Sequence, residues 1–92
     1  MIVRILGEGQ WRVDDHEVDA LNPLDEKVEQ AVEAGDEGTF RAALEDLLSA
    51  VRRSGSQVGL AELVDSDLIL PPSDASIDEV KDLLSDEGLI PG

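Results

Sequence analysis

The feature that most constrains this chain is one apolar stripe in the segment TFRAALEDLLSAVRR, residues 39–53. Its apolar residues recur at the three- and four-residue intervals that define one face of an α-helix. They are Phe40, Ala43, Leu44, Leu47, Leu48 and Val51. A strand would place the adjacent Leu47 and Leu48 on opposite faces, so the pattern excludes a half-buried strand. We therefore predict an amphipathic helix, and we expect it at the centre of the core because it holds the only Phe.

Helical signals also precede this stripe. The segment Asp14–Leu21 is predicted to form a short helix with Asp14 or Asp15 at its N-cap. Pro23 is expected to interrupt that helix, because proline lacks the backbone N–H and its ring clashes with the preceding turn. Asn22 then caps a fresh helix in which Pro23 takes the first position.

The junction between the fresh helix and the apolar stripe is very short. Gly35 is a favourable helix C-cap, and the adjacent Asp36 can cap the next helix at once. The second helix is expected to end with Arg52 and Arg53 beside its negative pole and with Gly55 as its stop. So tight a corner predicts an antiparallel helix pair.

The first thirteen residues predict a β-hairpin. MIVRIL is rich in β-branched residues and QWRV resumes after Gly7-Glu8-Gly9, which suits a short loop needing positive φ. Alternation places Met1, Val3 and Ile5 on one face and Ile2, Arg4 and Leu6 on the other, while Trp11 and Val13 share a face. A lone hairpin is marginal in water, so it must pack on the helices or pair with another strand.

The rest of the chain predicts short elements. Residues 54–59 read as a polar loop, and residues 60–64 could form one helical turn. The apolar run near 67–70, ending before two prolines, could add a third, edge strand to the hairpin. Ser76–Ser85 is expected to form the last helix, because SIDE matches a capping box.

Length and charge bound the class of protein. Ninety-two residues suffice for one domain, residues 1–92, and the predicted elements give an α+β fold. A net charge of −15 repels nucleic acids and anionic lipids, so it fits a basic protein partner or simple solubility. Cysteine is absent from the sequence, and no apolar run is long enough to span a bilayer, so we expect a cytoplasmic protein without membrane insertion.

Site-like chemistry is sparse. Asp14-Asp15-His16-Glu17 could ligate a divalent metal, but acidic residues at a helix N-terminus explain the same cluster. His16, the only histidine, would have to serve any Ser–His–Asp arrangement, and no serine stands in a nucleophile-elbow motif. We expect no catalytic residue, no cofactor and no metal.

Candidate binding residues lie on the predicted strands. Trp11 could anchor an interface or cap the core. Arg4 and Arg12 could be neighbours across the hairpin and form a basic island, although surface pairing with carboxylates explains them as well. The Leu68-Ile69-Leu70 edge could accept a strand from a partner or from a second copy, which leaves a homo-oligomer open.

Several segments taken together resemble a known family. MIVRILGEGQWRV, AVEAGDEGTFRAALEDLLSAV, DLILPPSDASIDEVKDLL and the ending EGLIPG resemble the PspA-associated protein family, PspAA. MIVRILGEGQ, LPPSDAS and GLIPG are the most specific of these, and the resemblance runs nearly end to end. It implies a non-enzymatic accessory or adaptor of the PspA (phage shock) membrane-stress response, acting by contact with PspA, a coiled-coil protein. It also implies association with membranes only through PspA.

A rival hypothesis comes from the charge. A strongly acidic domain could mimic a nucleic acid and occupy a basic, nucleic-acid-binding protein. Carboxylates gathered on one face would favour this mimic, and carboxylates spread around the surface would disfavour it.

Overall fold

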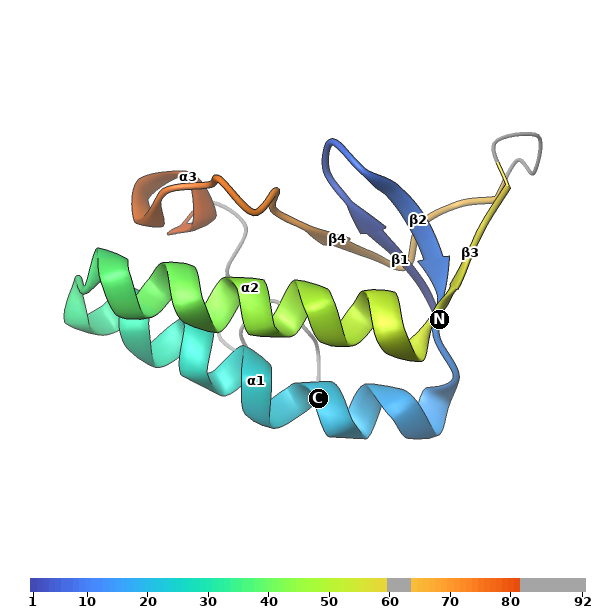
Figure 1. Cartoon of the computed structure of the whole chain (residues 1–92), viewed down its shortest axis with the longest axis horizontal. Coiled ribbons are helices and arrows are strands. Elements are labelled where there is room, and N and C mark those ends of the chain that lie inside the picture. The colour runs from blue at the N-terminus through green and yellow to red at the C-terminus, as the bar shows by residue number, and fades with distance from the viewer. Residues whose placement is uncertain (60–63, 82–92) are drawn as a thin grey trace.

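The computed structural model describes residues 1–59 and 64–81 of the chain. The elements in order are β1 (Ile2–Ile5), β2 (Gly9–Arg12), α1 (Asp15–Ala34), α2 (Glu37–Ser54), β3 (Ser56–Gln57), β4 (Leu68–Leu70) and α3 (Ile77–Lys81). Figure 1 shows α1 and α2 side by side, with the sheet and α3 on the side of α2 opposite to α1. The predicted α+β class, with a hairpin packed on an antiparallel helix pair, is confirmed.

The sheet is mixed and has the strand order β3-β2-β1-β4. β1 and β2 form the predicted antiparallel hairpin, whose loop uses Gly7 at φ 85° and Gly9 at φ 140°. These angles lie in the left-handed region, where a side chain would be strained. β4 pairs in parallel with β1, so the expected third strand is confirmed.

β3 was not predicted, because residues 54–59 read as a polar loop. Its two residues pair antiparallel with β2, placing Gln57 opposite Trp11 and Ser56 opposite Arg12. The Val58 N–H donates to the Gln10 carbonyl at 2.9 Å and extends the pairing. Both side chains of β3 are exposed, so this strand is formed by backbone pairing alone. It therefore has no apolar alternation from which it could have been predicted.

α1 runs without interruption through Pro23, so the predicted break at this residue is wrong. Pro23 costs the helix one hydrogen bond and a ring clash, about 3 kcal/mol in a helix interior. On both sides of it, however, the same face is buried and largely apolar, from Leu21 before the proline to Val28 and Val32 after it, and α1 packs against α2. Burying that continuous face outweighs the local cost.

The corner between the helices is built as predicted. Gly35 takes a left-handed conformation at φ 69°, and its N–H and that of Asp36 donate to carbonyls of the last turn of α1. The Asp36 carboxylate accepts from the Thr39 N–H at 3.1 Å and from the Thr39 hydroxyl at 2.8 Å. These contacts hold the pKa of Asp36 below its usual value, the Thr39 hydroxyl contributing most. Gly55 ends α2, also as predicted.

The core lies between the helix pair and one face of the sheet. Its largest fully buried side chains are Phe40, Ile5, Leu21, Leu44, Leu47, Leu48, Leu70, Val3, Val13, Val28 and Val51. All six residues of the predicted stripe on α2 are buried, which confirms its central place. Half of the predicted capping box of α3 is present, since the Ser76 hydroxyl accepts from the Glu79 N–H at 3.3 Å. The predicted turn at 60–64 and the end of the predicted helix at 82–85 fall largely or wholly outside the described residues.

Candidate protein-binding surface

The two faces of the sheet differ sharply in character. The inner face packs on the helices through Val3, Ile5, Trp11, Leu68 and Leu70, all of which are buried. Strand alternation points the intervening residues the other way. We call this second side the outer face; its described strand residues are Ile2, Arg4, Gln10, Arg12, Ser56 and Ile69, and Leu6 and Asp67 lie on it next to β1 and β4.

Strand register places the outer-face residues relative to one another. Arg4 lies opposite Gln10 on β2 and beside Ile69 on β4. Arg12 lies opposite Ile2, so it is the diagonal neighbour of Arg4 on the same face. The two arginines therefore share a face, as the hairpin pattern predicted.

Charge on the strands runs against that of the whole protein. The chain has 22 acidic and 7 basic residues. Within the described strands, however, the only charged residues are Arg4 and Arg12. Two carboxylates lie beside them in the segment that leads into β4: Asp67, which accepts from the Ile2 N–H at 2.7 Å, and the exposed Asp65. The outer face therefore carries charges of both signs.

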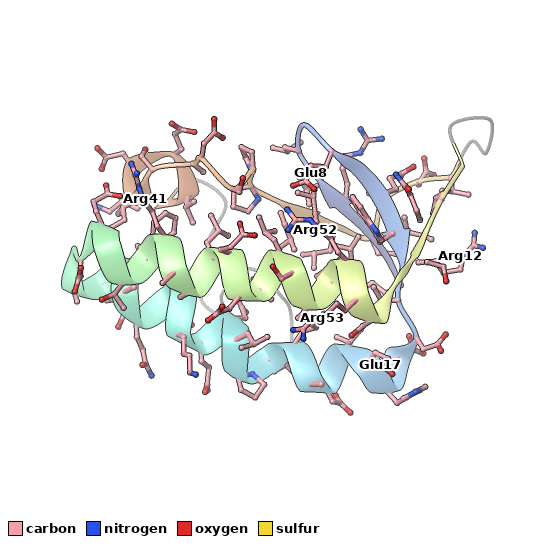
Figure 2. All side chains as sticks on the ribbon, viewed as in Figure 1. Glu8, Arg12, Glu17, Arg41, Arg52 and Arg53 are labelled. Carbon is pink, nitrogen blue, oxygen red and sulfur yellow. The ribbon has the colours of Figure 1, made fainter. Side chains whose placement is uncertain are left out.

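The guanidinium of Arg4 is exposed and lightly held. Its Nε donates to the Ser66 hydroxyl at 3.3 Å, and no carboxylate among residues 1–59 and 64–81 forms an ion pair with it. Arg12 is exposed as well, and Figure 2 shows its side chain projecting outward at the β3 end of the molecule. Arg4 therefore keeps donors that a carboxylate from another molecule could use.

A segment of chain leading into β4 is fixed against the outer face. The Gln10 amide donates through Nε2 to the Val64 carbonyl at 3.0 Å and to the Ser66 hydroxyl at 2.9 Å. Ser66 therefore links Gln10 to Arg4. Because Gln10 and Arg4 are opposite each other in the hairpin, these bonds give the polar part of the face a defined geometry.

Apolar side chains flank Arg4 on the outer face. Among the described residues, the only exposed large hydrophobics are Leu6 and Ile69, with exposed fractions of 38% and 47%. Both lie on the outer face. Single exposed apolar residues are ordinary on protein surfaces, but two beside an arginine make a mixed surface of the kind that binding interfaces use.

The other candidate binding residues from the sequence lie elsewhere. Trp11 is only 8% exposed and sits in the core, which favours its role as a core cap. Leu68 and Leu70 also face inward, so of the apolar run on β4 only Ile69 reaches the surface. The structure thus brings Arg4, Arg12 and Ile69 together and separates them from Trp11.

The acidic segment 14–17 opens α1. Asp14 is the N-cap of α1, without a side-chain capping bond, and the His16 Nε2 lies 3.5 Å from the Glu17 carboxylate. No group of His, Asp or Glu side chains within residues 1–59 and 64–81 is arranged to hold a metal ion.

Asp25, which the sequence reading did not single out, is a charged residue only 3% exposed on the inner face of α1. The sequence did carry a signal for its burial. Asp25 falls four residues after Leu21 and three before Val28, both of which are buried on the same face.

The chain forms a small α+β domain whose outer sheet face exposes polar, charged and apolar side chains. The chain belongs to the PspA-Associated protein family, PspAA, whose family model matches residues 1–92. Neither the curated proteins nor the solved structures include a significant match to the chain. Among the described helices, none combines the length and the apolarity needed to cross a bilayer.

Proposed function

We propose that this protein is a non-enzymatic accessory or adaptor of the PspA envelope-stress response, acting by contact with PspA or with the partners of PspA. The observation that carries the proposal is the family match over the whole chain, since the name of the family implies association with PspA. The protein acts in the cytoplasm and reaches the membrane only through PspA. It needs no cofactor for this role.

The surface supports a binding role. Leu6 and Ile69 are exposed near Arg4 on a face that the described helices leave uncovered. Covering this face removes apolar side chains from water, which is energetically favourable. A partner protein would supply that cover.

The rival hypothesis, an acidic mimic of nucleic acid, finds less support. It required carboxylates gathered on one face. The exposed carboxylates of the described residues are instead distributed over α1, α2, the segment before β4 and α3, for example Glu26, Glu45, Asp65 and Asp78.

Cells provide the test of the accessory role. A strain lacking this protein is compared with wild type under membrane stress, and the membrane-bound fraction of PspA is followed by fractionation and immunoblotting. The proposal expects that fraction to change on deletion and to return when the wild-type chain is reintroduced. A Phe40→Asp chain, whose core cannot form, serves as the negative control. An unchanged PspA distribution in the deletion strain contradicts the proposal.

A further inference from the structure

We draw no further inference here: the strongest candidate, the row of exposed carboxylates that Asp15, Asp19, Glu26 and Glu33 form along the solvent side of α1, carries nothing, because it is an acidic cluster beside which no second feature of residues 1–59 and 64–81 points to a ligand.

Discussion

Arg52 and Glu8 join the end of α2 to the tip of the β1–β2 hairpin through a two-bond contact. The Arg52 Nε donates to the Glu8 Oε1 at 2.9 Å, and a terminal guanidinium nitrogen donates to the other carboxylate oxygen. Figure 2 shows the two side chains facing each other between helix and sheet. The Glu8 contact raises the pKa of Arg52 above its usual value, and Glu45, at 3.3 Å, adds to the effect. The planar fork of arginine fixes relative orientation as well as distance.

Glu8→Gln is expected to lower the free energy of unfolding by about 1 kcal/mol, because it removes the charge from a partly exposed two-bond pair. Urea unfolding at low salt measures the loss, and the loss should shrink in concentrated salt as the pair is screened. Glu45→Gln is the matched control, since it changes the net charge equally but touches Arg52 by one longer bond. The free energy of unfolding of Glu45→Gln should lie within about 0.5 kcal/mol of the wild-type value. If both variants lose the same unfolding free energy, the net charge, and not the two-bond contact between Glu8 and Arg52, is responsible for the stabilisation.

The stability of the fold is expected to depend on pH through Asp36, the N-cap of α2. The folded-state pKa of Asp36 is depressed below 3.8, so its ionised form stabilises the fold. That contribution is fully present above the unfolded-state pKa and is lost as the pH falls through the folded-state pKa. Asp36→Ala should therefore lower the melting temperature at neutral pH, and the difference from wild type should narrow in acid. Asp36→Asn keeps a capping oxygen without a titrating charge. A melting difference for Asp36→Ala that is constant from neutral to strongly acidic pH would contradict this account.

Replacing Pro23 within α1 is expected to make the fold more stable. Pro23→Ala removes the ring clash and supplies the missing backbone N–H, so the free energy of unfolding should rise by about 2 kcal/mol. The extra freedom that alanine gives the unfolded chain offsets part of the gain. Urea unfolding measures the change, with Lys27→Ala at another exposed α1 position as a near-neutral control. A loss of stability in Pro23→Ala would mean that α1 needs the proline to follow the surface of α2.

Gly55 lies where α2 meets the hairpin, and its surroundings leave little room for a side chain. A Cβ at this position would lie 2.9 Å from the Val51 carbonyl oxygen, 3.0 Å from the Trp11 Cβ and 3.1 Å from the Arg12 carbonyl oxygen. Gly55→Ala should therefore destabilise by about 1–3 kcal/mol as the backbone shifts. The fluorescence of the single, buried Trp11 reports the unfolding. Gly59, where a Cβ meets nothing within 4 Å, is the matched control, and Gly59→Ala should be neutral to slightly stabilising. Equal effects at both glycines would contradict the packing explanation.

Local signals were sufficient for most of the fold. The two-residue alternation around Gly7 and Gly9 predicted the hairpin, and the three- and four-residue spacing predicted α2, because each depends on neighbours close in sequence. The errors came from long-range effects. Pro23 remains helical because α2 packs along the whole of α1, and β3 exists because its backbone meets β2. Neither contact can be read from local propensity.

The candidate surface was predictable only in part. Alternation alone placed Arg4 and Arg12 on one face of the hairpin. The place of Ile69 beside Arg4 required the parallel register of β4 with β1, and β4 follows β3 only after a connection of ten residues. Trp11 could have faced either way until the helices were shown to cover its side of the sheet.

The most direct test of the central proposal, the accessory role toward PspA, is co-elution with light scattering. The protein and PspA from the same organism are run separately and together on a sizing column, at low and at high salt. The account predicts a new peak whose mass exceeds that of PspA alone and which contains both chains. A complex that persists at high salt would indicate apolar contact, and one that dissociates would indicate charge. Two unshifted peaks at both salt concentrations would contradict direct association with PspA.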